Sequence, residues 1–222
     1  MQTEIILNTV CFCGFFLLLY RNRYNDLRLI NSKGELTDKS IQRVRFHIIC
    51  IAWLLAFIPL IKQFRTLHLI NSVEVPLTST LILAAAFVVT MIIVFFSATQ
   101  NSVNVSQSWR TIANSVLVSY LVVRLLFLFA YEIFMRGSVL PVLIDATGTW
   151  IAILFNTILY GILHAFASRK EIIGSLLFGP ILCFVTIQFQ ALWPAITLHL
   201  MLAVAYEGIQ LSHHFKSLKQ PI

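Results

Sequence analysis

The sequence predicts an all-α fold, a polytopic bundle of about seven transmembrane helices with very little mass outside the bilayer. The chain of 222 residues is 59% hydrophobic and only 11% charged, whereas soluble domains are typically about 25% charged. Its apolar residues occur in long runs rather than in an alternating or amphipathic pattern. A continuous helix is the structure by which such a run satisfies its own backbone hydrogen bonds in lipid.

The apolar runs define the expected spans, because a helix needs roughly 20 residues to cross the hydrocarbon core. The chain begins Met1-Gln2-Thr3-Glu4, without the basic region of a cleavable signal peptide, so we expect the first run to be a retained anchor. We expect one membrane domain over residues 1–222, with three spans in 1–112. The predicted spans are residues 4–20, 46–62, 77–97, 113–140, 148–167, 171–189 and 193–211.

Basic residues gather on one predicted side of the bundle. With the N-terminus outside, the inner side holds twelve Lys and Arg residues, seven of them in the loop 21–45, and the outer side holds only Lys62, Arg65 and Arg136. Cytoplasmic loops carry such an excess, so we expect a multi-pass protein of the cell membrane with a cytoplasmic C-terminus. Because the charge lies beside the spans, the net charge of +7 indicates membrane topology rather than nucleic-acid binding.

Ionisable side chains inside apolar spans are costly in free energy and therefore mark candidate functional sites. Arg136 follows Glu132 by one helical turn, which places the two on one helix face as an ion pair; whether this pair is structural or catalytic stays open on composition alone. The five ionisable residues well inside apolar sequence are Arg124, Glu132, His164, His199 and Glu207.

Two histidines and a glutamate on three different spans suggest a hydrolytic site. A Glu can act as general base on a water molecule, and imidazoles can position that water or stabilise an oxyanion. With straight spans, however, His164 and His199 differ in depth by on the order of 15 Å. Gly179-Pro180 is a candidate break in the sixth span. Glu207 lies about 80° around the helix from His199, so we expect it at the membrane boundary.

Residues 120–207 resemble the CPBP family, which contains the type II CAAX prenyl proteases and the bacteriocin self-immunity (Abi) proteins. That family carries the motifs Glu-Glu-x-x-x-Arg, Phe-x-x-x-His and His-x-x-x-Asn/Asp on membrane helices. The corresponding segments here are Tyr131-Glu132-Ile133-Phe134-Met135-Arg136, Tyr160-Gly161-Ile162-Leu163-His164 and His199-Leu200-Met201-Leu202-Ala203.

The chain departs from this pattern at Tyr131, which replaces the first Glu, and at Ala203, which replaces the Asn or Asp. A subset of the family is similar at both places, with Tyr-Glu-x-x-x-Arg-Gly at the first motif and His-x-x-x-Ala-x-x-x-Asp/Glu at the last. Glu207 stands at that final acidic position, and Glu171 resembles a Glu that the subset often carries after the second motif.

The resemblance implies a glutamic-type intramembrane endopeptidase that cleaves a membrane-anchored protein or its terminal sorting segment, with a catalytic core at 113–211. Glu132 would activate water, His164 and His199 would hold that water and the oxyanion, and Arg136 would orient Glu132. We expect no metal and no cofactor, and as partners only the lipid bilayer and a membrane protein or peptide substrate. The supporting residues are Tyr131, Tyr160, Glu171 and Glu207.

Two other functions remain open. Tyr131 and Ala203 fit a non-catalytic immunity or interaction protein of the same fold. His164 and His199 could instead be the axial ligands of a bis-His haem redox protein.

Overall fold

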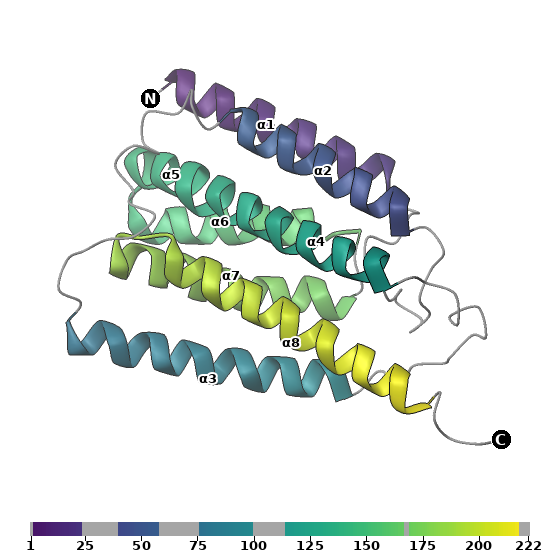
Figure 1. Ribbon diagram of the computed structural model, residues 1–222. Helices are drawn as coiled ribbons and strands as arrows, with labels where there is room; N and C mark the ends of the chain where they lie inside the picture. The colour runs from purple at the N-terminus through teal and green to yellow at the C-terminus, as the bar shows by residue number, and fades with distance from the viewer. Residues whose placement is uncertain (1, 24–39, 58–75, 100–113, 167–168, 218–222) are drawn as a thin grey trace.

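The structure is a computed structural model that describes residues 2–23, 40–57, 76–99, 114–166 and 169–217. In these ranges the chain is helical apart from short turns, which confirms the predicted all-α bundle (Figure 1). The helices are α1 (Gln2–Arg21), α2 (Ser40–Ala56), α3 (Leu77–Thr99), α4 (Asn114–Phe134), the π-helical η4 (Met135–Val139), α5 (Leu140–Thr147), α6 (Thr149–Leu163), α7 (Arg169–Phe189) and α8 (Trp193–Ser217).

When α4, η4 and α5 are counted as one stretch, successive helical stretches run in opposite directions, and the start of α1 and the end of α8 lie at opposite ends of the bundle (Figure 1). Within the described ranges, three stretches are long and apolar enough to cross a membrane, namely Gln2–Arg21, Val118–Thr147 and Glu171–Phe189. The apolar helices Leu77–Ile92 and Thr149–Leu163 are shorter. The total of seven crossings therefore stays a prediction, as does the charge count, because residues 24–39 of the basic loop and both Lys62 and Arg65 lie outside the described ranges.

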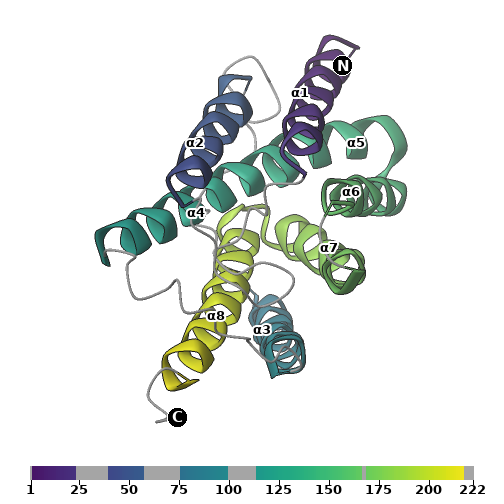
Figure 2. The same ribbon diagram turned by 90° about the vertical axis from the view of Figure 1, so that its right-hand side faces the viewer.

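The longest continuous helical stretch runs through α4, η4 and α5, and Figure 2 shows it between α1 and α2 on one side and α6, α7 and α8 on the other. It ends at Gly148, whose φ of 82° permits the tight turn into α6. The fourth predicted span, 113–140, therefore ended too early. Arg136 lies eleven residues before the end of this stretch and is fully buried among other side chains, so counting it with the basic residues of the outer side was wrong.

The turn between α7 and α8 lies inside the bundle rather than at its surface. Ala191 and Leu192 are fully buried, and Leu192 packs with Ile133 of α4. Because α8 begins at this depth, His199 reaches Glu132, near the middle of the continuous stretch formed by α4, η4 and α5. The expected separation in depth rested on straight, full-length spans and does not apply. The proposed break at Gly179-Pro180 was also wrong, since α7 continues through Pro180.

The first two helices pack closely through a small residue. Trp53 of α2 donates a hydrogen bond from Nε1 to the carbonyl oxygen of Cys11, at 2.9 Å. The Trp53 ring crosses α1 at Gly14, where an added Cβ would lie 2.1 Å from the ring. Glycine at this position therefore permits the close approach of α1 and α2.

We expect Gly14→Ala to destabilise the protein by about 1–3 kcal/mol, because overpacking forces neighbouring side chains off their preferred rotamers. Thermal unfolding in detergent measures the effect. Gly174→Ala is the matched control, since an added Cβ at Gly174 of α7 meets nothing within 4 Å. Equal unfolding temperatures for the two variants would contradict this account of the α1–α2 contact.

Candidate functional site

Glu132 and Arg136 form an ion pair that is sealed inside the bundle. Glu132 lies in the last turn of α4, and Arg136 follows in η4. The Nη1 atom of Arg136 lies 3.3 Å from Oε1 of Glu132, and both residues are 0% exposed. The guanidinium also lies over the Tyr160 ring, with its Cζ 4.6 Å from the ring centroid. A buried carboxylate requires such compensation, because an isolated charge in a low-dielectric interior is strongly unfavourable.

A π-helical turn carries Arg136, and Asn156 of α6 stabilises that turn. The N–H of Leu140 donates to the carbonyl of Met135, as a π-helix requires. The same carbonyl accepts a second hydrogen bond from Nδ2 of Asn156, at 2.9 Å, and the thiol of Cys183 donates to Oδ1 of Asn156, at 3.2 Å. Sequence reasoning missed Asn156, although an amide within an apolar span is itself a signal for hydrogen bonding between helices.

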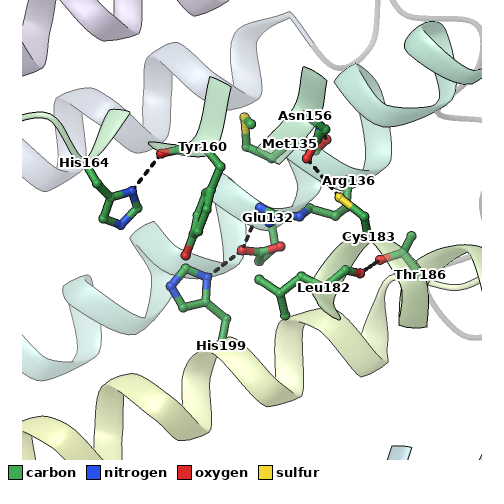
Figure 3. A network of polar contacts seen from close by, with 10 residues as sticks. All are labelled: Glu132, Met135, Arg136, Asn156, Tyr160, His164, Leu182, Cys183, Thr186 and His199. Atoms are coloured by element: carbon green, nitrogen blue, oxygen red, sulfur yellow. Dashed lines mark hydrogen bonds and ion pairs between the residues drawn. The ribbon is translucent and has the colours of Figure 1, made fainter. Parts of the chain in front are cut away.

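His199 of α8 contacts the same carboxylate oxygen (Figure 3). Its Nδ1 lies 2.5 Å from Oε1 of Glu132, and the residue is only 6% exposed. A carboxylate can only accept, so Nδ1 carries the proton when Glu132 is ionised. The lone pair of the neutral imidazole is then at Nε2. The structure therefore brings together Glu132 and His199, which the sequence separates by 67 residues.

The two oxygens of Glu132 have different surroundings. Oε1 contacts both Arg136 and His199, whereas Oε2 is buried without a hydrogen-bond partner among the described residues. The Tyr131 hydroxyl is likewise buried and, within the described part of the chain, unpartnered. The Tyr131 ring lies 6.1 Å from the His199 ring, edge to face. One oxygen of Glu132 is thus anchored, while the other retains its accepting capacity.

Tyr160 lies beside both His164 and His199 (Figure 3). Its ring centroid is 4.6 Å from that of His164 and 6.1 Å from that of His199. His164 contacts the backbone of the same residue, with Nδ1 2.9 Å from the Tyr160 carbonyl oxygen. Because a carbonyl accepts, Nδ1 donates and Nε2 carries the lone pair. His164 therefore lies next to the site, on the far side of the Tyr160 ring from Glu132.

Two supporting residues predicted from the sequence lie apart from this centre. Glu207 of α8 pairs with Arg124 of α4, with 3.4 Å between Arg124 Nε and Glu207 Oε1. It follows His199 by about 12 Å along the helix. Glu171 lies in the first turn of α7, about 18 Å along that helix from Cys183.

The histidines and acids do not form a metal site in the described residues, where no three His, Cys, Asp or Glu side chains gather closely enough to hold an ion. Zinc catalysis usually takes three protein ligands and an open position. Here His199 directs one nitrogen at the carboxylate, and the Tyr160 ring separates His164 from it. The absence of a metal in the working protein stays a prediction.

Residues 113–205 match the family model described as "Type II CAAX prenyl endopeptidase Rce1-like". The matched segment runs from the start of α4 into α8 and contains Glu132, His164 and His199. It confirms the predicted resemblance to the CAAX protease family over these residues, and together with the apolar helices it indicates a membrane protein. The resemblance to the Tyr-Glu subset is not tested. No curated protein and no solved structure gives a significant match.

Arg136→Gln should destabilise the protein strongly, by about 3–5 kcal/mol, because it leaves the Glu132 carboxylate buried and uncompensated. The double variant Glu132→Gln/Arg136→Gln should recover much of that loss, since it removes both charges. The free energy of unfolding in detergent, measured for all four members of this cycle, gives the coupling. A double variant no more stable than Arg136→Gln would show that the ion pair is not the reason for the loss.

Proposed function

We propose that this protein is an intramembrane endopeptidase of the glutamic type, with Glu132 as its general base. The observation that carries the proposal is the asymmetry of the Glu132 carboxylate. Oε1 contacts Arg136 and His199, and Oε2 is left able to accept the proton of a water molecule. Because Oε1 is fixed, the Oε2 atom is held in one position. A general base needs such a position, within hydrogen-bond reach of the proton that it takes.

In the proposed reaction, water adds to the carbonyl carbon of the scissile peptide bond as its proton passes to Oε2 of Glu132. The negative charge then develops on the former carbonyl oxygen, where hydrogen-bond donors stabilise it. We assign this role to the imidazoles of His199 and His164 in their protonated form, supported by the Tyr131 hydroxyl. Glu132 finally returns its proton to the leaving amine as the carbon–nitrogen bond breaks, giving a new carboxylate and a new amine.

Arg136 and Tyr160 support this site without taking part in proton transfer. Arg136 holds the Oε1 side of the carboxylate, which leaves Oε2 directed to the water. The Tyr160 ring packs under that guanidinium and against both imidazoles. The family match supports a peptide or protein substrate in a lipid bilayer. We propose that the substrate is a membrane-anchored protein or its terminal sorting segment. We further propose that the peptidase itself is a multi-pass protein of the cell membrane whose N-terminus is outside and whose C-terminus is cytoplasmic.

A non-catalytic immunity or interaction protein is the second candidate. The observations that favour it are the full burial of Glu132, the replacement of the family's first Glu by Tyr131, and the apolar Ala203, which packs against the core cluster that contains Tyr131. The haem alternative does not fit the geometry. The Tyr160 ring packs against both His164 and His199, and the latter directs Nδ1 at Glu132 rather than at a shared metal position.

Glu132→Gln should reduce cleavage by at least about 100-fold, because an amide cannot accept the water's proton. The test compares intact masses of membrane and secreted proteins from cells that express wild-type protein or the variant at equal levels. One or a few proteins should change from a trimmed to an untrimmed form.

Glu207→Gln is the matched control, because it makes the same chemical change at a carboxylate that lies on α8, about 12 Å beyond His199. It should leave the masses unchanged from the wild type. If Glu132→Gln also left every mass unchanged while cells lacking the protein lost a protective phenotype, the interaction function would replace the peptidase assignment.

A further inference from the structure

The π turn that carries Arg136 is also bonded to the first helix of the chain. The hydroxyl of Ser138, in η4, donates a hydrogen bond to Oδ1 of Asn8, in α1, at 2.5 Å. Asn8 is 6% exposed and Ser138 is 0% exposed. At the other end of the amide, Nδ2 of Asn8 donates to the carbonyl oxygen of Glu4, at 3.1 Å. Because that carbonyl can only accept, the orientation of the Asn8 amide is fixed, with Oδ1 directed at Ser138.

Asn8 lies on the buried face of α1. The buried residues of this helix recur at intervals of three or four, as on one face of a helix; they are Glu4, Asn8, Cys11, Phe15 and Leu19. A buried amide is unfavourable unless it is hydrogen-bonded, and a single Asn in a largely apolar seam fixes the register of the helices that meet there. The bond to Ser138 therefore sets the position of α1 along the stretch formed by α4 and η4.

In this register, α1 also packs beside the candidate site. Phe15 follows Asn8 by about two helical turns, and its ring centroid lies 6.0 Å from that of Tyr131. Tyr131 directly precedes Glu132 in the sequence. The first helix thus contacts residues on both sides of Glu132 along the chain, although it lies outside the residues 113–205 that match the family model.

Side chains from two helices hold the π turn. Asn156 of α6 bonds to a backbone carbonyl at its start, and Asn8 of α1 bonds to Ser138 near its end. Figure 2 shows α1 and α6 on opposite sides of the stretch formed by α4, η4 and α5. A π turn is rare and is hydrogen-bonded from residue i to i+5. Bonds that preserve it therefore also preserve the position of Arg136 relative to the Glu132 carboxylate.

We propose that Asn8 is a positioning residue of the peptidase. Through Ser138 it holds the π turn, and with it the Arg136 guanidinium, in place on Oε1 of Glu132. Without this bond the guanidinium would shift, and Oε2 would no longer be held in one position. Misplacement of reacting groups by 1 Å can cost about 100-fold in rate. The role in cleavage rests on the proposed peptidase function, whereas the hold on the π turn does not.

The first measurement determines kcat and KM of the full-length protein in lipid nanodiscs. Its substrate is the peptide that the wild type cleaves fastest from a library of membrane-anchored peptides. Asn8→Leu keeps the size of the side chain and removes the acceptor, so it should lower kcat by about 10-fold with little change in KM. Thr9→Val is the matched control and should cleave like the wild type, because the exposed Thr9 hydroxyl bonds to the Ile5 carbonyl of its own helix, at 2.7 Å.

The second measurement does not depend on cleavage. Hydrogen–deuterium exchange of the backbone amides of residues 135–140 reports how often the π turn opens. Exchange should be about 10-fold faster in Asn8→Leu than in the wild type, because a buried hydrogen bond that holds the turn is lost. It should be unchanged in Thr9→Val. If Asn8→Leu does not fold, Ser138→Ala removes the same hydrogen bond from its other end and should give both effects.

The outcomes separate this inference from the peptidase function. In the double variant Asn8→Leu/Ser138→Ala the two losses of kcat should not add, because both substitutions remove one hydrogen bond. Losses that multiply, or an Asn8→Leu variant that cleaves as fast as the wild type, would overturn the inference and leave the peptidase function standing. A wild type that cleaves no peptide would overturn the peptidase function and the role in cleavage, and exchange would then decide whether Asn8 holds the turn.

Discussion

The negative charge of a carboxylate buried within a membrane bundle must be offset by nearby donors or positive groups. The side chains at the centre of this structure do so for Glu132. An isolated charge would be strongly unfavourable in this environment, so a guanidinium and an imidazole from two different elements meet on one oxygen. The π turn that carries Arg136 depends in turn on Asn156, which bonds the Met135 carbonyl across the helix interface. The geometry around Glu132 thus depends on hydrogen bonds made by residues that do not contact its carboxylate.

The sequence alone predicted the contact of this centre that lies within one helical turn. Glu132 and Arg136 are separated by one helical turn, and that spacing alone predicts an ion pair. The contact between Glu132 and His199 depends instead on where α8 begins. The estimate of the depth of His199 from straight, full-length spans fails, because the α7–α8 turn is buried at Leu192. The role of Asn156 could not be predicted either, since a single amide in an apolar run does not indicate which carbonyl it will reach.

Glu207 belongs to a second polar centre of the bundle, which lies apart from the one at Glu132. Its place after His199 resembles a family position, yet its carboxylate pairs with Arg124, and its helix carries it about 12 Å beyond the histidine. His47 of α2 packs against Phe127, over which the Arg124 guanidinium also lies. Apolar packing between Phe127 and Tyr131, whose rings lie 6.1 Å apart, separates this region from Glu132. Aromatic side chains thus lie between the two polar centres.

The central claim is that Glu132 activates water for peptide hydrolysis and that His199 stabilises the oxyanion that forms. The most direct measurement incubates the purified protein, reconstituted in lipid nanodiscs, with a library of membrane-anchored peptides in ¹⁸O-labelled water, followed by mass spectrometry of the products. The wild type should yield new C-termini that carry oxygen from the solvent, and His199→Gln should yield almost none. The claim would be contradicted if His199→Gln cleaved as well as the wild type, or if the wild type cleaved nothing.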